Sequence, residues 1–327
     1  MARADGGAGY RFAVKDLLLR VLRSRLLRAG FVVVALVLGG ISVANRWNDV
    51  RPVLHRLDAG WLAVSFAAAL LALIASAAMW RSLLADLGSR LPARVAGRVF
   101  LVSQLGKYVP GSVWPVLAQM ELARDHDVPR TRAATASILV MVMNLASGLF
   151  VAAVTIPVFA GDVAVRYRWM LLLAPVILAF LYPRVLNPLL SLVLRVAKRP
   201  PMEHELRLRD VSRAFAWSLA AWLAYGVHAW LLVLGVGTHS PEALPLAIGG
   251  FALAFCAGFL VVIVPAGAGV RDVALAAALS PVLGPGGAIV VSLASRLVLV
   301  VADLASAGGA ALTARGTMRA NRHAVKN

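Results

Sequence analysis

The chain has 327 residues, of which 61% are hydrophobic and 15% are charged, and its mean hydropathy is +0.81. Soluble domains have about 45–50% apolar and about 25% charged residues, so this composition excludes a water-soluble fold; the helix-length apolar runs also exclude a membrane β-barrel. The net charge of +18 does not indicate nucleic-acid binding, because the basic residues lie between apolar runs, where they mark cytoplasmic loops and meet anionic headgroups.

The N-terminal segment, residues 1–28, contains seven basic residues with apolar residues between them, which predicts an amphipathic helix on the cytoplasmic leaflet. A basic region of this length is unusual for a cleaved secretory signal. We therefore expect residues 29–314 to form one transmembrane domain and residues 315–327 to form a basic cytoplasmic tail.

Seven apolar runs are candidates for membrane crossings, and several are bounded by the Trp or Tyr typical of membrane interfaces: Ala29–Ala44, Trp61–Trp80, Ala133–Ala160, Trp169–Tyr182, Ser212–Val236, Ala243–Val264 and Gly286–Thr313. Two further apolar stretches, Val95–Met120 and Pro265–Leu283, are interrupted by Pro and Gly. Both ends of the chain are basic, which predicts cytoplasmic termini and an even number of crossings. We expect Pro265–Leu283 to be the eighth crossing and Val95–Met120 to be re-entrant, although the sequence leaves open which of the two returns.

On this topology, 26 basic residues lie on the cytoplasmic side and five on the outer side, a strong positive-inside bias. The longest polar stretch, Arg184–Arg213, is too short to fold as a soluble domain. The sequence therefore predicts an all-α, polytopic bundle of about eight crossings with one re-entrant segment.

A weak internal repeat is visible in two long apolar runs. Asn144-Leu145-Ala146-Ser147-Gly148 recurs as Asp303-Leu304-Ala305-Ser306-Ala307, and each copy follows a Pro/Gly break, at Pro110 and Gly111 or at Pro265, Gly267 and Gly269. Paired breaks in corresponding halves indicate a transporter's central site, because broken helices expose backbone groups to a substrate. Ala-rich helices also resemble one another by chance.

Two motifs resemble a known family. The stretch Gln104–Trp114, with Gly-Lys-Tyr-Val-Pro-Gly at its centre, is similar to a signature of the lysylphosphatidylglycerol synthase transmembrane family, whose fold is flippase-like. Pro265–Asp272 is similar to that family's second motif, and Ser295-Arg296 followed by Asp303 is similar to its Ser-Arg-then-Asp helix. The resemblance covers roughly residues 25–315 and two motifs in order.

The resemblance implies an eight-crossing module of bacterial inner membranes that moves or handles charged phospholipids or polyprenyl-linked glycolipids. The family's synthases carry the aminoacyl-transferase activity in a C-terminal domain, which we do not expect in this chain, so synthase activity is not transferred. Two departures matter: Asn144 stands where the family often has an acidic residue, and Asp272 stands where Glu is usual.

Arg296 and Asp303 are the central candidates for a substrate site. They are two helical turns apart and can face one cavity, and charged side chains at the centre of a membrane helix cost about 2.5–3.5 kcal/mol each. One interpretation is a static polar tie between helices. The other is that Arg296 binds a lipid phosphate, while Asp303 orients it or meets a cationic headgroup.

Other polar residues are candidates for the same site, and each of them also has an alternative role. Arg271 and Asp272 begin a half-helix that attracts anions, although Arg271 could reach the inner headgroups instead. Lys107 and Tyr108 could contact phosphate or anchor the chain at the interface. Asn144 could bind substrate or a neighbouring helix.

Two residues are assigned structural roles. Glu121 is expected to be a solvated helix-end charge, and His228 a hydrogen-bonded core histidine rather than a proton relay. No catalytic set, metal-ligand cluster or phosphate-binding loop is found in the sequence, and Cys256, the single cysteine, cannot form an intramolecular disulfide. We therefore expect no cofactor and no enzyme activity.

These observations predict a protein that moves or handles anionic phospholipids or polyprenyl-phosphate glycolipids through a cationic groove. Its partners would be membrane lipids and anionic headgroups of the cytoplasmic leaflet, with a membrane protein partner also conceivable. The alternatives are a membrane transferase with Asp272 or Asp303 as base, and a non-transporting subunit of another membrane enzyme.

Overall fold

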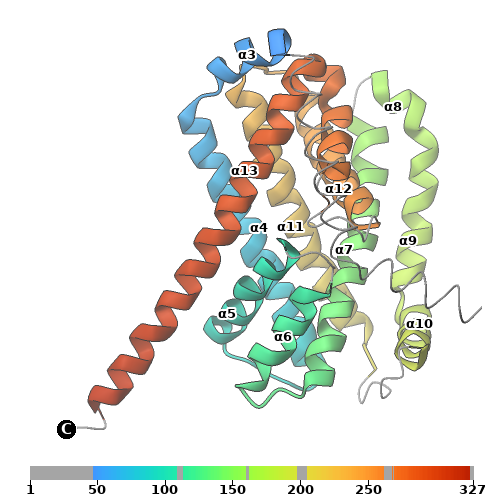
Figure 1. The fold of residues 1–327 in the computed structure, drawn as a ribbon. Helices are drawn as coiled ribbons and strands as arrows, with labels where there is room; N and C mark the ends of the chain where they lie inside the picture. The colour runs from blue at the N-terminus through green and yellow to red at the C-terminus, as the bar shows by residue number, and fades with distance from the viewer. Residues whose placement is uncertain are drawn as a thin grey trace, which may run out of the picture.

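The computed structural model describes residues 47–108, 113–159, 162–196, 205–260, 267 and 269–324, and all regular elements in these ranges are helices (Figure 1). The predicted all-α class is confirmed. The segment 1–28 and the apolar run Ala29–Ala44 lie outside the described residues. In chain order the elements are α3 (Trp47–Arg56), α4 (Ala59–Asp86), α5 (Ala93–Ser103), η1 (Gln104–Tyr108), α6 (Trp114–Arg124), α7 (Arg130–Phe159), α8 (Asp162–Tyr167), η2 (Arg168–Leu172), α9 (Leu173–Leu181), α10 (Pro183–Val196), α11 (Leu208–Gly235), α12 (Ala243–Leu260) and α13 (Val270–Ala324).

Two long apolar helices, α4 and α11, pack against each other in antiparallel directions. At one end, the Asp58 side chain caps α4 and the Asp58 N–H donates to the Gly235 carbonyl at 3.1 Å. At the other end, Arg213 of α11 forms an ion pair with Asp86 of α4. We call these the α3 end and the basic end of the bundle.

Helices α5 and α6 form hairpin one (residues 93–124), which begins and ends at the basic end. Arg98 Nη2 and His126 Nε2 lie 2.7 Å apart at its base, and η1 lies at its tip. Each helical arm has 11 residues. Such an arm is about 16 Å long, about half the thickness of the hydrocarbon core. This is the re-entrant path predicted for Val95–Met120.

Helix α12 and the first arm of α13 form hairpin two (residues 243–283), which begins and ends at the α3 end. Gly284, with φ 66° and ψ 171°, breaks α13 into a first arm (270–283) and a second arm (285–324). Gly250 faces Ala278 and Gly258 faces Arg271, a pairing that requires antiparallel arms. A Cβ atom on Gly250 would lie 2.6 Å from the Ala278 Cβ, so glycine permits this close approach.

Hairpin two extends only to the middle of the bundle. Near the end of α12, the Cys256 Sγ lies 3.7 Å from the carbonyl of Leu145, halfway along the 30-residue helix α7. In Figure 1, α12 occupies the half of the bundle toward α3, and α5 and α6 occupy the other half. The eight crossings expected from the sequence needed Ala243–Val264 and Pro265–Leu283 to cross completely, and this count is not confirmed.

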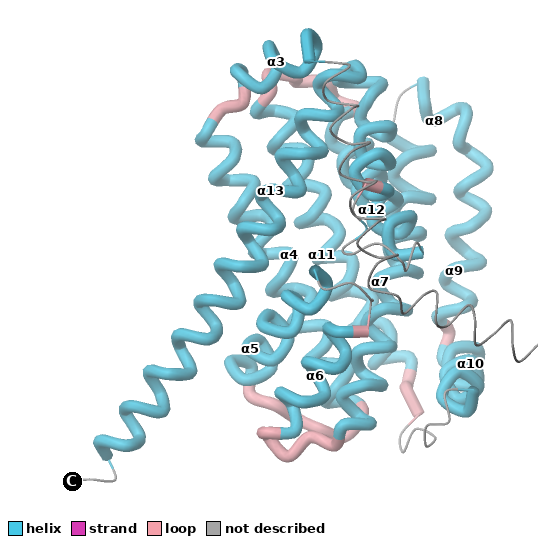
Figure 2. The backbone as a smooth tube through the Cα atoms, viewed as in Figure 1, coloured by secondary structure: helices cyan, strands magenta, loops and turns pink. Residues whose placement is uncertain are grey.

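The chain repeats one pattern twice, a long helix, a hairpin and a second long helix. The first copy is α4, hairpin one and α7, and the second is α11, hairpin two and the second arm of α13. Because α4 and α11 are antiparallel and the hairpins enter from opposite ends, the copies are inverted (Figure 2). The similar stretches Asn144–Gly148 and Asp303–Ala307 lie in the corresponding helices. Many transporters build a central site from inverted repeats of this kind.

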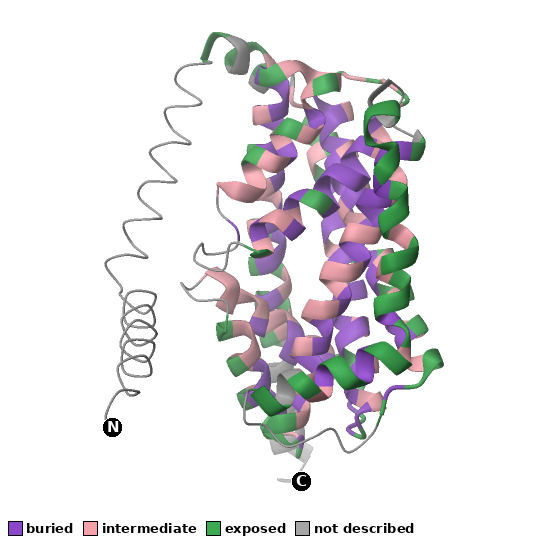
Figure 3. Ribbon diagram, turned by 90° about the vertical axis from the view of Figure 1, so that its right-hand side faces the viewer, coloured by how far each residue is buried: buried purple, intermediate pink, exposed green. Residues whose placement is uncertain are grey.

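The segment α8–η2–α9 joins the two copies and runs from the α3 end to the basic end, where α10 bends away from it by 70°. Its apolar side chains, such as Val176 and Phe180, are exposed. Figure 3 shows buried residues between the helices and exposed residues on the outer faces. Among the described residues, five helices are long and apolar enough to cross a membrane, or six if the bent pair counts as one span.

Candidate functional site

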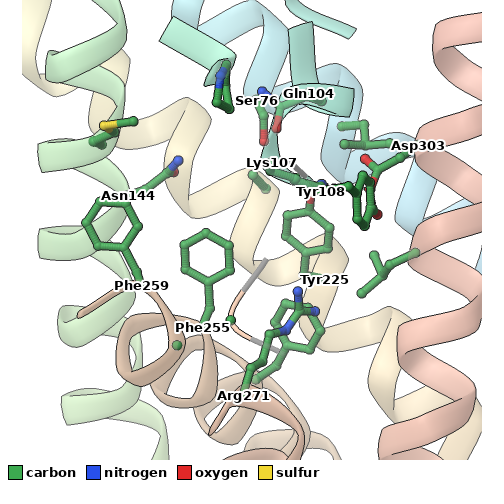
Figure 4. A pocket seen from close by; sticks show the side chains of 18 of the residues that line it. Ser76, Gln104, Lys107, Tyr108, Asn144, Tyr225, Phe255, Phe259, Arg271 and Asp303 are labelled. Carbon is green, nitrogen blue, oxygen red and sulfur yellow. Dashed lines mark hydrogen bonds and ion pairs between the residues drawn. The ribbon is translucent and has the colours of Figure 1, made fainter. Parts of the chain in front are cut away.

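A cavity of about 220 Å³ lies where the tips of the two hairpins meet (Figure 4). Both copies of the repeat contribute to its walls, which come from α4, α5, η1, α6, α7, α11, α12 and the two arms of α13. Its wall contains three cationic and two anionic side chains: Lys107, Arg271, Arg296, Asp272 and Asp303.

Asp303, in the second arm of α13, is 1% exposed and joins this arm to the tip of hairpin one. Its Oδ2 accepts from the Lys107 ammonium at 2.7 Å and from the Tyr108 hydroxyl at 2.5 Å. Its Oδ1 is buried with no hydrogen-bond partner among the described residues. Lys107 is 32% exposed, so this ion pair lies at the border of the cavity rather than in closed packing.

Asp272, three residues after the turn of hairpin two, joins the two arms of α13. Its carboxylate accepts from the N–H of Gly269 at 3.0 Å and lies 2.9 Å from the Nε of Arg296. Its backbone carbonyl accepts from the Ser292 hydroxyl. Arg296 uses Nε for this contact, and among the described residues its two Nη groups have no partner. These groups are the fork that binds phosphate oxygens in pairs.

Arg271 faces the cavity without a carboxylate partner in the described part of the chain. Its guanidinium carbon lies 4.6 Å from the ring centroid of Phe251 and 5.9 Å from that of Phe255, and Figure 4 shows the side chain pointing toward Tyr225. A cation–π contact stabilises by about 0.5–2 kcal/mol, less than the about 2.5–3.5 kcal/mol cost of a charge at the centre of a membrane helix. Arg271 is therefore available to an anion.

Two amide side chains form an uncharged polar wall. The Oδ1 of Asn144 accepts from Ser218 at 3.0 Å, and the Oε1 of Gln119 accepts from Ser137. Each amide therefore has its oxygen engaged and keeps NH₂ donors. Asn144 and Gln119 both line the cavity, and Figure 4 shows the Asn144 amide beside Phe259.

The structure brings together all seven polar residues that the sequence nominated for substrate binding. Lys107 and Tyr108 lie in η1 beside Asp303, and Arg271 lies inside the bundle beside Phe251. All seven line the one cavity: Lys107, Tyr108, Asn144, Arg271, Asp272, Arg296 and Asp303.

The structure describes two of the five Pro and Gly residues that were predicted to interrupt helices. Gly267, with φ 64°, and Gly269, with φ 81°, adopt the left-handed conformation that favours glycine. A Cβ atom on Gly267 would also lie 3.1 Å from the Cα of Gly258, so the arms meet closely at this turn. Pro110, Gly111 and Pro265 lie outside the described residues.

The two residues that were given structural roles lie outside the cavity wall. His228 is buried, with Nδ1 2.7 Å from the Ser65 hydroxyl and Nε2 2.9 Å from the Ser295 hydroxyl, so it connects α11 with α4 and α13. Glu121 is exposed and pairs with Arg130 at 2.8 Å, and this hydrogen bond lowers the pKa of Glu121.

Sequence reasoning missed the aromatic and amide walls of the cavity. Tyr225, Phe251 and Phe255 occur in apolar helices, where aromatic residues usually indicate core packing. Gln119 and Ser137 were also missed, although a glutamine and a serine near the middle of apolar helices are a usable signal for a polar wall.

The arrangement can bind an anion. In the described ranges, no group of three His, Cys, Asp or Glu side chains is placed to hold a metal ion. Both carboxylates in the cavity wall are engaged by cations, whereas Arg271 and the Nη groups of Arg296 remain available as donors. These groups can bind a phosphate.

The comparisons with known proteins agree with the motifs. A family model described as the lysylphosphatidylglycerol synthase TM region matches residues 27–307. A search of curated proteins found no match. The matched range includes both copies of the repeat and all the charged residues of the cavity. The family points to a multi-pass membrane protein that handles lipids. The chain belongs to the lysylphosphatidylglycerol synthase transmembrane family.

Proposed function

We propose that this protein translocates anionic phospholipids or polyprenyl-phosphate glycolipids, with the headgroup passing through the cavity while the tails stay in the bilayer. The observation that carries the proposal is the cation-lined cavity at the meeting point of two opposed hairpins. A charged headgroup needs such a polar site, because hydrocarbon is a costly environment for charge.

Two ion pairs offer contacts that an entering phosphate can exchange. Lys107 pairs with Asp303 across the two copies of the repeat, and Arg296 pairs with Asp272 between the arms of α13. A phosphate that takes Lys107 away from Asp303 weakens the tie between hairpin one and α13. Binding of the headgroup then favours movement of this hairpin, since a ligand shifts the population toward the conformation that it binds better.

The inverted repeat supports movement in both directions. Hairpin one enters from the basic end and hairpin two from the α3 end, and residues of both line the cavity. Opening one hairpin at a time would expose the same cations to one leaflet and then to the other, which is alternating access.

We place the protein in a bacterial inner membrane with both termini in the cytoplasm. The positive-inside bias supports this orientation, because Arg90, Arg124, Arg130 and the arginines of α10 lie at one end of the bundle, while Arg51 and Arg166 lie at the other. With Ala29–Ala44 as one crossing, the path through α4, α7, α8–α9, α11 and the second arm of α13 gives cytoplasmic termini.

We infer transport rather than transferase activity. A transferase of the kind considered above needs Asp272 or Asp303 as a free base, but Asp272 contacts Arg296 and Asp303 contacts Lys107. Membrane lipids are then the partners, and the proposed cycle uses no cofactor and no nucleic acid. A partner subunit would be detected as a protein that co-purifies in fixed proportion.

Translocation of labelled lipid by the purified protein in liposomes tests the proposal. An acyl-labelled phosphatidylglycerol is incorporated in both leaflets, and a membrane-impermeant quencher reports how fast inner-leaflet lipid reaches the outer leaflet. We expect Arg296→Ala to slow translocation at least about tenfold, since a charge-assisted hydrogen bond contributes about 1.5–3 kcal/mol. Asp303→Asn should also slow it, because the tie to hairpin one changes.

A matched control separates the cavity from general charge effects. Arg184→Ala removes the same charge from an exposed position on α10 and should translocate like the wild type. Size-exclusion profiles verify that each variant is folded. Equal rates for wild type, Arg296→Ala, Asp303→Asn and empty vesicles would refute the transport function, and product formation from labelled lipid donors would establish the transferase alternative.

A further inference from the structure

The charges in the cavity wall do not balance. Three cations face two carboxylates, and each carboxylate is already paired, Asp303 with Lys107 and Asp272 with Arg296. The residues between the arms that lie outside the described ranges, 109–112, 261–266 and 268, are all uncharged in the sequence. Among the described residues, the cavity therefore carries one positive charge in excess, that of Arg271.

The cavity wall also has an excess of free hydrogen-bond donors. The oxygens of Asn144 and Gln119 are occupied by serine hydroxyls, and their NH₂ groups remain as donors. Arg271 and the Nη groups of Arg296 add further donors. Both carboxylates of the wall already have a cation as partner, and the one oxygen without a hydrogen bond, Oδ1 of Asp303, is buried. An ammonium group, which can only donate, therefore finds no carboxylate that lacks a cation, whereas phosphate and hydroxyl oxygens meet several donors.

The two kinds of donor come from different helices. Arg271 and Arg296 belong to α13, whereas Asn144 belongs to α7 and Gln119 to α6. A ligand that fills the cavity therefore meets guanidinium groups on one wall and neutral amides on another. This arrangement matches a phosphodiester that carries an uncharged, oxygen-rich substituent.

From this charge and donor balance we propose that the cavity selects lipids with one net negative charge, in which the phosphodiester carries a hydroxyl-bearing neutral group such as glycerol or a sugar. It discriminates against headgroups that carry an amine, including aminoacylated ones. This inference rests on the proposed function, since it names the substrate class of the same cavity. The phosphate contacts Arg271 and Arg296, and the hydroxyl oxygens accept from Asn144 and Gln119.

Equilibrium competition on the purified full-length chain in detergent tests this selectivity. Bound acyl-labelled phosphatidylglycerol is displaced by unlabelled phosphatidylglycerol, phosphatidylethanolamine, phosphatidylcholine or lysyl-phosphatidylglycerol with identical acyl chains, and by a polyprenyl-phosphate hexose. We expect phosphatidylglycerol to compete at least about tenfold better than the three lipids with a cationic nitrogen, a difference of about 1.4 kcal/mol. The hexose and glycerol arms identify which neutral group fits better.

Two variants lower the net charge of the cavity in different ways, one by removing a cation and the other by adding a carboxylate. Arg271→Gln removes the excess charge and should lower phosphatidylglycerol affinity about tenfold while leaving phosphatidylethanolamine nearly unchanged. The matched variant Arg271→Lys keeps the charge and should retain the preference. Asn144→Asp adds a carboxylate to the amide wall, so lysyl-phosphatidylglycerol should bind better than it does to wild type.

The results separate this inference from the proposed function. Equal or tighter binding of lysyl-phosphatidylglycerol by the wild type would overturn the selectivity, even if liposomes show fast translocation. A preference for phosphatidylglycerol that Arg271→Gln abolishes and Arg271→Lys retains would support it, even in a protein that moves no lipid. If Arg271→Gln does not fold, the Asn144→Asp arm decides: unchanged discrimination against the lysyl lipid would overturn the proposal.

Discussion

Hairpin one and hairpin two approach the same cavity from opposite ends, but they are held in place by different interactions. Hairpin one has short arms that pack into a core with α4 and α7 through side chains such as Val99 and Phe100, and ion pairs hold it at its tip and near its base. At its tip, Lys107 and Tyr108 bind Asp303, and near its base Glu121 binds Arg130. The tip contact lies at the cavity, where a phosphate can compete for it.

Hairpin two is held by close packing as well as by the ion pair of Asp272 with Arg296. Gly250 permits contact with Ala278, and Gly258 permits contact with Gly267 and Arg271. Close-packed interfaces resist deformation, whereas an ion pair can be exchanged for another ion pair. Hairpin two therefore presents the charge of Arg271 at a fixed position, whereas a ligand can change the position of hairpin one.

The largest expected effect concerns the depth of hairpin two. In a Leu260→Cys variant the new thiol lies at the end of α12, at mid-depth, and should not react with a membrane-impermeant maleimide from either side. His239→Cys, exposed in the loop at the α3 end, should be labelled from the outside of oriented cells. The native Cys256 is 1% exposed and gives little background. Rapid labelling of Leu260→Cys from the cytoplasm would instead support a full crossing by Ala243–Val264.

The next effect concerns the ion pair at the tip of hairpin one. Lys107→Met leaves the buried carboxylate of Asp303 without its cation and should lower the free energy of unfolding by about 2–3 kcal/mol. This is less than the about 3–5 kcal/mol of a fully buried pair, because Lys107 is 32% exposed. Adding Asp303→Asn should recover at least half of the loss, as measured by chemical unfolding in detergent. Additive losses would show that the two side chains are not coupled.

A smaller effect is expected from the packing of hairpin two. Gly250→Ala places a Cβ atom 2.6 Å from the Ala278 Cβ and should destabilise the protein by about 2 kcal/mol through overpacking. The control is Gly97→Ala in α5, where nothing lies within 4 Å, and alanine should stabilise the helix by about 0.5–1 kcal/mol. Thermal unfolding compares the two variants. The same shift for both would show that hairpin two is not tightly packed.

The smallest effect is at the base of hairpin one. The hydrogen bond from Arg130 lowers the pKa of Glu121, so the pair stabilises the fold above the unfolded-state pKa of about 4.3 and loses this contribution as the pH falls through the lower folded-state value. Glu121→Gln should therefore lower Tm slightly at pH 7, with the difference disappearing in acid. A difference that persists or grows below pH 4 would contradict this assignment.

The sequence predicted the long helices well, because their apolar runs are unbroken. The run Trp61–Trp80 lies within α4, and Ser212–Val236 corresponds to α11. The sequence did not predict how deeply hairpin two enters the bundle. The 18 residues of α12 are long and apolar enough for a full membrane crossing. The expectation of an even number of crossings does not distinguish the two paths of hairpin two. Two full crossings and one re-entrant hairpin both return the chain to the end where it began.

The candidate site was predictable because ionisable residues in apolar helices are rare. Arg296 and Asp303 were visible on that ground alone. Their partners were not, because Tyr108 approaches Asp303 from 195 residues away in sequence, and Lys107 lies beside Tyr108 in the other copy of the repeat. The excess charge of Arg271 also required coordinates, since only the pairing of Asp272 with Arg296 leaves Arg271 without a carboxylate.

The repeat is symmetric in its backbone but not in its charge. Asp303 of α13 anchors the tip of hairpin one, whereas Asn144, at the corresponding position in α7, binds Ser218 and offers no anion to hairpin two. Exchanging the roles of the two hairpins would therefore not exchange equivalent contacts, and the two end states differ by one ion pair. Without a ligand, the protein would then populate mainly one of the two states. A single carboxylate, that of Asp303, would determine which state this is.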